Sequence, residues 1–470
     1  MNQEKRTRKK PLPLDVSVPR SVNRSAKAVT FLLVAFLGGL VYLGWTLVRE
    51  SPMYMAKSGR GKYGIVYDRH GDVLYDGTNA PESYPAGQFA DVGNLIGDDK
   101  KYMTNTFVQK HLMELVNYSF SSEGVGQVAL TTTLDHQANK AVYDALGKKN
   151  GTVIACNWKT GEVLVCVSKP CVDITKGYGD IEKMENGSLL CKAFYPIVPG
   201  STQKVSTLIA AYEKLGVDTV NEMQFDCTGS WLNASGQRIN CHDSKGHGTQ
   251  LLGEAFAHSC NPYFAQLVQS EKLPLSAIIE TYTRMGYAVN GAKADALSLD
   301  GITIAPASTT LTDAKDFDTQ WGCLGQGETL VSPYQLMLWQ TAIASGTGRA
   351  TVPYLLASRT NFYGKVEQIG KTAQTKQMFT WSAAKAVQDV MVENSTKHYY
   401  VSLPDFQCGV KSGTAQVEQD GKKYENSLLA GFCLDEDCPV AFCIVIEERV
   451  SNDTTTAQIA KKLLHALSGR

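Results

Sequence analysis

Apolar residues follow different spacings along the chain, and each spacing predicts a different kind of element. An uncharged run from Ala28 to Val48 extends over 21 positions, which is long enough for a helix to cross a bilayer. Between Val205 and Leu215 the apolar residues recur every three or four positions, which indicates one face of a helix ended by Gly216. Short apolar runs after residues 151 and 406 are instead typical of strands.

The N-terminal pattern predicts a membrane anchor. Residues 1–27 carry eight lysines and arginines against two acidic residues, so we expect this tail to stay in the cytoplasm. Tyr42 and Trp45 suit the far membrane interface. A cleaved signal peptide is the alternative, but its apolar region would be shorter and no small-residue cleavage site follows. We therefore expect a single-pass anchor over 28–48 and an extracytoplasmic body after it.

The body is expected to contain a small domain followed by a large one. Residues 49–128 are mostly polar, with two strands around a His-Gly turn in 64–74 and one helix over 106–118. We interpret this part as a pedestal, because about eighty residues cannot build a large core. The second domain is expected to cover 129–470.

The large domain is predicted to have an α+β fold. A helix capped by Asp135 precedes a hairpin, three more strands follow late in the chain, and a helix ends it. Two early and three late strands predict one five-stranded antiparallel sheet covered by helices. The strand ranges are 152–158, 162–168, 407–417, 427–433 and 440–447. Residues 170–400 are largely helical and should form a second, mostly α lobe, with the site in a cleft between the two.

Charge and composition exclude some partners. The chain has 46 basic and 46 acidic residues and no nucleic-acid motif, so nucleic acid is not an expected partner. All twelve cysteines lie between Cys156 and Cys443, in the part expected outside the cell, where disulfides form. The candidate pairs are Cys227/Cys241 and Cys433/Cys438, and buried free thiols are the alternative.

The loop that holds Cys241, His242 and His247 offers candidate zinc ligands. The spacing of these residues fits no standard zinc site, which favours a polar loop. We therefore expect no metal and no cofactor.

Candidate chemistry begins at the helix that follows Gly200. Ser201 starts this helix, and Lys204 lies three residues later on the same side. A serine hydroxyl is a weak nucleophile until a base stands beside it, and a desolvated lysine can be that base. Taken alone, this spacing is also common in ordinary capped helices.

Two further segments offer polar groups to a cleft. Ser259 and Asn261 lie at a predicted break between two helices, since Pro262 disfavours a helical conformation at Asn261. Lys411 and Thr414 flank Gly413 inside the first late strand, where a cation and a hydroxyl could receive a carboxylate. A plain Asn-Pro turn and a surface strand with a glycine bulge are the alternatives.

Together the three segments resemble the signature of penicillin-binding proteins and serine β-lactamases. They are Ser-x-x-Lys at 201–204, Ser-x-Asn at 259–261 and Lys-Ser-Gly-Thr at 411–414. With the anchor and the Gly-Ile-Val-Tyr-Asp-Arg-His-Gly box at 64–71, the chain resembles a class B penicillin-binding protein with a short pedestal. Such proteins are membrane-anchored D,D-transpeptidases of peptidoglycan synthesis, and the resemblance makes 129–470 the transpeptidase domain.

The resemblance implies a role for each residue. Ser201 would attack the penultimate D-Ala of a stem peptide to form an acyl-enzyme, Lys204 would accept the serine proton, and Ser259 would relay a proton to the leaving amine. Backbone N–H groups of Ser201 and Thr414 would form the oxyanion hole. β-Lactams, which mimic D-Ala-D-Ala, would be trapped on Ser201. The implied substrate-binding residues are Asn261, Lys411, Ser412, Gly413 and Thr414.

Other functions remain open at this point. A D,D-carboxypeptidase shares all three segments and passes the acyl group to water, a class D-like β-lactamase shares two, and a non-catalytic β-lactam sensor or scaffold would only bind. The resemblance also implies a polytopic glycan polymerase as partner, contacted through the anchor and pedestal. It does not distinguish roles in elongation, division and sporulation.

Overall fold

The computed structural model describes residues 20–57, 62–79, 89–117, 127–399, 403–419, 421–450 and 454–470. The chain divides into two compact units, 1–61 and 62–470, which are described separately. The first contains helix α1 (Arg20–Lys57), whose stretch Val22–Leu47 is apolar and long enough to cross a membrane and has no part buried within the protein. The predicted span of 28–48 lies within α1, and the basic residues before Arg20 lie outside the described residues.

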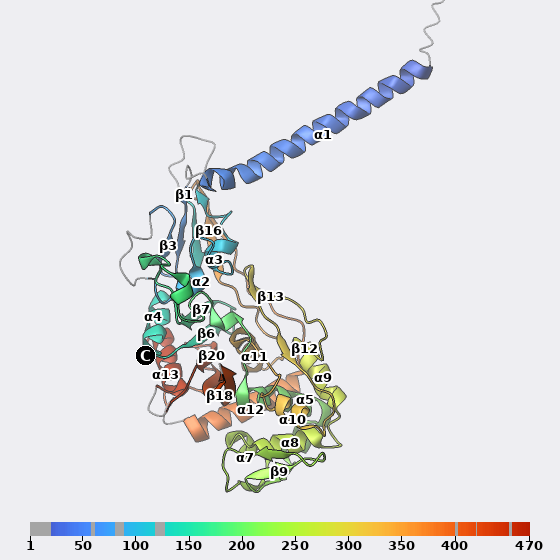
Figure 1. Ribbon diagram of the computed structural model, residues 1–470, viewed down its shortest axis with the longest axis vertical. Helices are drawn as coiled ribbons and strands as arrows, with labels where there is room; N and C mark the ends of the chain where they lie inside the picture. Colours follow the sequence, from blue (N-terminus) through green and yellow to red (C-terminus); the bar gives the residue numbers. More distant parts are fainter. Residues whose placement is uncertain are drawn as a thin grey trace, which may run out of the picture. The chain divides into compact units, whose positions relative to one another are not determined.

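The second unit is built on the predicted five-stranded antiparallel sheet (Figure 1). Its strand order is β18-β19-β20-β6-β7, so the hairpin from the start of the domain pairs with the last strand of the chain. The prediction of one sheet closed by the two ends of the domain is therefore confirmed. The strands are β6 (Gly151–Asn157), β7 (Val163–Lys169), β18 (Cys408–Gln419), β19 (Lys422–Cys433) and β20 (Val440–Ile446).

Helices cover both faces of this sheet. Along β6, Val153 packs with α4 (His136–Ala145) and α13 (Thr456–Ser468), whereas its neighbour Ile154 belongs to the core on the other side. This alternation follows from the two-residue period of a strand. The opposite face is covered by α11 (Pro333–Ala344), in which every residue is buried, and α12 (Trp381–Asn394) lies along β18. Asp135 caps α4 by accepting from the Ala138 N–H, as predicted.

The middle of the chain forms the predicted mostly α lobe, with small two-stranded sheets that were not predicted. Its other helices are α5 (Lys204–Leu215), α6 (Val217–Asn221), α7 (Leu252–Ala257), α8 (Asn261–Gln269), α9 (Leu275–Arg284) and α10 (Phe317–Cys323). The paired strands are β8 (Phe225–Cys227) with β11 (Gly248–Gln250), β9 (Ser230–Leu232) with β10 (Arg238–Asn240), β12 (Tyr287–Val289) with β15 (Ala307–Thr309), and β13 (Leu297–Leu299) with β14 (Ile302–Ile304).

The strands expected in the pedestal belong to a second five-stranded sheet that extends beyond it. The order is β17-β16-β5-β2-β3, where β2 (Ile65–Tyr67) and β3 (Val73–Asp76) are the predicted pair. The other strands, β5 (Ala129–Thr132), β16 (Leu356–Thr360) and β17 (Val366–Gln368), come from after residue 128. The expected pedestal of 49–128 therefore shares a sheet with strands of the large domain.

The helix predicted over 106–118 is much shorter in the structure. Helix α3 covers only Phe107–Lys110, and α2 (Gly93–Ile96) is a single turn before it. Strand β4 (Val116–Asn117) pairs with β1 (Lys62–Tyr63). Two residues that were predicted to lie near the end of the helix therefore form a strand. Tyr118 lies outside the described residues.

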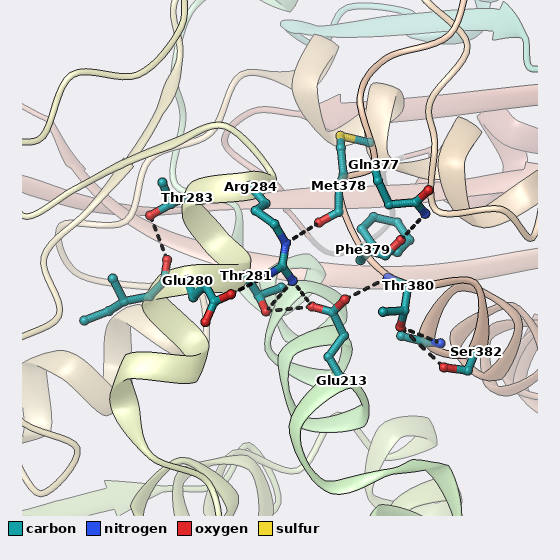
Figure 2. A network of polar contacts seen from close by, with 12 residues as sticks. Glu213, Glu280, Thr281, Thr283, Arg284, Gln377, Met378, Phe379, Thr380 and Ser382 are labelled. Carbon is teal, nitrogen blue, oxygen red and sulfur yellow. Dashed lines mark hydrogen bonds and ion pairs between the residues drawn. The ribbon is translucent and has the colours of Figure 1, made fainter.

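A buried carboxylate joins three helices of the α lobe (Figure 2). Glu213, near the end of α5, accepts hydrogen bonds from the Thr281 hydroxyl of α9 at 2.8 Å and from the backbone N–H of Thr380, the N-cap of α12, at 2.7 Å. It also pairs with Arg284 of α9. Only 9% of the Glu213 side chain is exposed, against 72% for Glu280, which pairs with the same arginine.

We expect Glu213→Ala to lower the free energy of unfolding by about 2–3 kcal/mol, because it leaves two donors without their acceptor and the half-buried Arg284 with only the exposed Glu280 as its ion-pair partner. Glu280→Ala is the matched control, and its exposed pair should contribute less than about 0.5 kcal/mol. Thermal unfolding of both variants measures the difference. Equal effects would show that the three-helix junction does not depend on this carboxylate.

Candidate active site

The three sequence segments meet at one cavity between the sheet edge and the α lobe. The cavity has a volume of about 650 Å³. Among its lining residues are Ser201, Ser259, Asn261, Ser412, Gly413 and Thr414. The two predicted lysines, Lys204 and Lys411, are 0% and 1% exposed and lie behind this lining. All eight predicted site residues are therefore brought together around one space.

Ser201 and Lys204 lie on one continuous helical segment. A 3₁₀ turn, η5 (Gly200–Gln203), carries Ser201 and runs directly into α5, which begins at Lys204. The three-residue spacing thus spans the join between the two elements, and α5 ends at Gly216, where φ is +84°, as predicted. Ser201 is half-buried at the cavity wall, while Lys204 extends into the core.

The hydroxyl of Ser259 lies between the two buried ammonium groups. Lys204 Nζ donates to the Ser259 carbonyl oxygen at 2.5 Å, to Asn261 Oδ1 at 2.7 Å and to Ser259 Oγ at 3.2 Å. Lys411 Nζ donates to Ser259 Oγ at 3.0 Å and to the Ser412 carbonyl oxygen at 2.8 Å. One serine hydroxyl is therefore in hydrogen-bond contact with both lysines, which makes it a suitable path for a proton between them.

Burial makes both lysines easier to deprotonate. Desolvation lowers the pKa of Lys204 to about 7, with small opposing effects from Cys260 and Cys241. Desolvation, together with repulsion from Lys204, holds the pKa of Lys411 well below its usual value. An amine that is neutral near pH 7 can accept a proton from a serine hydroxyl, whereas an ordinary surface lysine cannot.

The predicted break between two helices is present at Ser259 and Cys260, but Asn261, which was expected to be non-helical, belongs to α8. Asn261 is the first residue of α8, with Pro262 in the first helical turn, where its missing N–H is not needed. The chain reverses instead at Ser259, whose φ of +52° is in the left-handed region. This conformation is uncommon for a residue other than glycine and turns the Ser259 carbonyl and hydroxyl toward the lysines.

Close backbone contacts explain the glycines of the site. A Cβ atom on Gly413 would lie 2.9 Å from the Pro199 carbonyl oxygen and 3.2 Å from the Ser201 nitrogen. A Cβ on Gly200, where φ is +55°, would lie 2.7 Å from the Thr414 carbonyl oxygen. Strand β18 therefore touches the turn that carries Ser201, which is the close approach that a glycine inside a strand allows.

Gln326 joins these two elements, and sequence reasoning assigned it no role. Its side-chain Nε2 donates to the Thr414 carbonyl oxygen at 3.0 Å, and its Oε1 accepts from the Gln416 N–H at 3.3 Å. The preceding Gly325 accepts a hydrogen bond from the Gly200 N–H at 2.8 Å. The signal that could have found it is the Gly-Gln-Gly-Glu sequence at 325–328, where glycines flank a single amide.

The twelve cysteines are all free thiols in the structure. The two candidate disulfides, Cys227/Cys241 and Cys433/Cys438, are therefore not formed, and the alternative of free thiols describes the structure. Ten of the twelve are buried, and the other two, Cys171 and Cys241, are half-buried. Cys241 also lines the cavity.

Comparisons with known proteins agree with this arrangement. The sequence model of the penicillin binding protein transpeptidase domain matches residues 151–465. The chain is 28% identical to stage V sporulation protein D of Bacillus subtilis over 289 residues, which is 59% of this chain and 42% of that protein. It is 23% identical to peptidoglycan D,D-transpeptidase MrdA of Acinetobacter baumannii over 362 residues, 71% of this chain and 52% of that protein. The chain thus spans about half the length of these curated relatives.

Solved structures share the fold. The D,D-transpeptidase domain of a peptidoglycan glycosyltransferase from Eggerthella lenta is similar with a TM-score of 0.71 at 20% identity, covering 87% of this chain and 98% of that one. Penicillin-binding protein A of M. tuberculosis, solved as a penicillin G acyl-enzyme complex, also gives a TM-score of 0.71, at 19% identity, covering 86% of this chain and 99% of that one.

If Lys204 acts as the base toward Ser201, the acylation rate should depend on pH through that lysine. Its neutral form is required, so the rate of acylation by a β-lactam should rise as pH increases through about 7 and then level off. Stopped-flow acylation between acidic and alkaline pH measures the profile. A rate that rises only near pH 10, the range of an ordinary lysine, would contradict a lowered Lys204 pKa.

Proposed function

The chain belongs to the penicillin-binding protein transpeptidase family, whose domain covers residues 151–465, and we propose that it is a membrane-anchored serine D,D-transpeptidase. In this proposal it cross-links peptidoglycan stem peptides through an acyl-enzyme on Ser201 and binds β-lactams covalently at the same oxygen. One observation supports it above all others: two buried lysines share the Ser259 hydroxyl behind the cavity that Ser201 lines.

The proposed reaction begins with neutral Lys204 taking the hydroxyl proton of Ser201. The serine oxygen bonds to the carbonyl carbon of the penultimate D-Ala, and the developing negative charge on the carbonyl oxygen would be stabilised by the backbone N–H groups of Ser201 and Thr414. The C–N bond to the terminal D-Ala then breaks. The leaving nitrogen takes a proton through Ser259, which is in contact with both lysines.

The remaining groups of the cavity would hold the substrate. Asn261 keeps its side chain fixed by accepting from Lys204 and by donating to the Asn240 carbonyl oxygen at 3.0 Å, which suits it to position the peptide amide. Ser412 and Thr414 offer hydroxyls to the terminal carboxylate, and Lys411 behind them supplies positive charge when protonated. An amine from a second stem peptide then attacks the ester, forming the cross-link and releasing Ser201.

A penicillin carrying a fluorophore tests the proposed nucleophile. The full chain in detergent should be labelled persistently, and Ser201→Ala should lose the label because it removes the hydroxyl that is proposed to form the ester. Ser235→Ala, an exposed serine outside the cavity, should be labelled like the unaltered chain. Labelling that persists in Ser201→Ala would refute the proposed nucleophile, and rapid release of the label would indicate a β-lactamase. Product analysis with a synthetic stem peptide separates cross-linking from carboxypeptidase activity.

The orientation in the membrane is part of the proposal. The cytoplasmic side would hold the basic tail, and the unit from Lys62 to Arg470 would lie outside, where peptidoglycan is found. A membrane-impermeant form of the same penicillin should therefore label intact spheroplasts. Labelling only after lysis would place the site on the cytoplasmic side.

We also propose that the partner is a polytopic glycan polymerase, contacted through the anchor and the pedestal. The pedestal exposes two large apolar side chains, Tyr102 at 52% and Met113 at 42%, and such residues are typical of interfaces. Asp68, in contrast, is buried and accepts three backbone N–H bonds, so changing it would disturb the fold rather than a surface.

The double variant Tyr102→Ser/Met113→Ser should reduce co-purification of the polymerase by about tenfold or more, since aromatic contacts contribute much of the affinity of an interface. Trp381→Ser is the matched control, because this residue is 68% exposed but lies on α12 of the α lobe. Penicillin labelling of each variant verifies its fold. Undiminished capture of the polymerase by the double variant would exclude this surface.

A further inference from the structure

Four side chains with metal-binding atoms converge beside the Ser259 turn. Cys227, Cys241, His247 and Cys260 place their sulfur and nitrogen atoms within 4.8 Å of one another. They come from four places in the chain: the end of β8, the residue after β10, the residue before β11 and the N-cap of α8. Cys227 and Cys260 are fully buried and the other two are half-buried.

The distances match the edges of a tetrahedral zinc site. His247 Nδ1 lies 3.5 Å from the Cys241 sulfur and 3.7 Å from the Cys227 sulfur. With Zn–S bonds of about 2.3 Å and Zn–N bonds of about 2.0–2.1 Å, ideal tetrahedral geometry places sulfur and nitrogen about 3.6 Å apart. Nδ1 is therefore already the nitrogen that faces the centre of the cluster.

Backbone hydrogen bonds hold together the chain segments that carry Cys227, Cys241 and His247. The His247 N–H donates to the Cys227 carbonyl oxygen and the Cys241 N–H donates to the Gly229 carbonyl oxygen, both at 2.9 Å. A Cβ on Gly229 would lie 2.1 Å from the Ser244 carbonyl oxygen, and one on Gly246 would lie 2.2 Å from that of Cys227. Both glycines have positive φ, so these tight crossings require glycine.

Two side chains outside the four ligands, Gln250 and His258, lie against the cluster. The side-chain nitrogen of Gln250, which is 2% exposed, has no hydrogen-bond partner among the described residues. His258 stacks on the His247 ring at 4.6 Å with 10° between the planes.

We propose that Cys227, Cys241, His247 and Cys260 bind one Zn²⁺ ion as a closed structural site. Binding displaces the protons of the three thiols, and the neutral imidazole coordinates through Nδ1, so the site carries a net charge of −1. Three sulfurs and one imidazole are a donor set that selects zinc, and four protein ligands leave no open position for catalysis. The ligand order does not follow a short-spacing motif, which is why the sequence favoured a polar loop.

The site would act on the reaction by positioning. Cys260 lies between Ser259 and Asn261, both of which contact Lys204. An ion bound to the Cys260 sulfur would hold Cys260 in place. It would thereby fix the two adjacent residues: Ser259, in the left-handed turn, and Asn261, the first residue of α8. This consequence rests on the proposed acyl-transfer function, whereas the presence of the ion does not.

Zinc content of the full chain, purified in detergent from zinc-supplemented cells, tests the site directly. Elemental analysis should find about one zinc per chain, and Cys241→Ser and Cys260→Ser should each lose most of it. Cys171→Ser, a thiol outside the cluster, and His242→Ala, the neighbouring histidine, should keep the full amount. Removal of zinc by a strong chelator should expose three additional titratable thiols, lower the melting temperature and slow penicillin acylation several-fold.

Other outcomes overturn the proposal. A zinc-free chain in which peptide mapping finds Cys227 joined to Cys241 would show that these two thiols form a disulfide instead. Loss of zinc in His242→Ala but not in His247→Ala would reject the ligand set. If the cysteine variants do not fold, cobalt substitution of the unaltered chain decides: absence of the intense absorption of tetrahedral cobalt thiolate refutes the site. Zinc binding without any effect on acylation would leave the ion in place and reject its positioning role.

Discussion

The rest of the site depends on the burial of two lysine ammonium groups around one serine hydroxyl. Lowering the pKa of Lys204 from 10.5 to about 7 corresponds to roughly 5 kcal/mol of disfavoured charging. The unfolded chain binds this proton more readily, so Lys204 lowers the stability of the fold increasingly as pH falls from about 10 to about 7. A fold that retains such a cost must obtain its stability elsewhere. The sheet with helices on both faces and the fully buried α11 supply the apolar core that provides it.

Burial of these lysines also requires the sheet and the α lobe to meet closely. Lys411 comes from strand β18, at the edge of the sheet, and Lys204 from the start of α5. The contact between Gly413 and the turn of Ser201 leaves no room for a side chain, and Gln326 bridges the same two elements. Small displacements of reacting groups strongly change the rate of a reaction. The contact between β18 and the turn of Ser201 therefore matters because it fixes the relative positions of site residues that come from two separate parts of the chain.

Local patterns were enough to predict most of the fold. The strand runs, the apolar face of α5 and the cap at Asp135 all depend on residues near one another in sequence. Tertiary pairing explains the rest: β4 replaces the end of a predicted helix, and β16 completes a sheet that begins nearly 300 residues earlier. The site residues were found because their motifs are short, but the shifted helix start at Asn261 was missed because proline is tolerated in a first turn.

The small sheets next to the site explain why an ion would be useful there. Strands β8, β9, β10 and β11 have three residues each and pair only two by two, and such pairs are marginal in water without further support. Their residues are mostly exposed or half-buried, so the apolar area that they bury is small. Segments of this kind are commonly held by disulfides or a metal. Because one of the four converging ligands is Cys260, the ion that stabilises these strands would at the same time hold the turn of Ser259, so local stability and catalytic geometry would depend on the same four bonds.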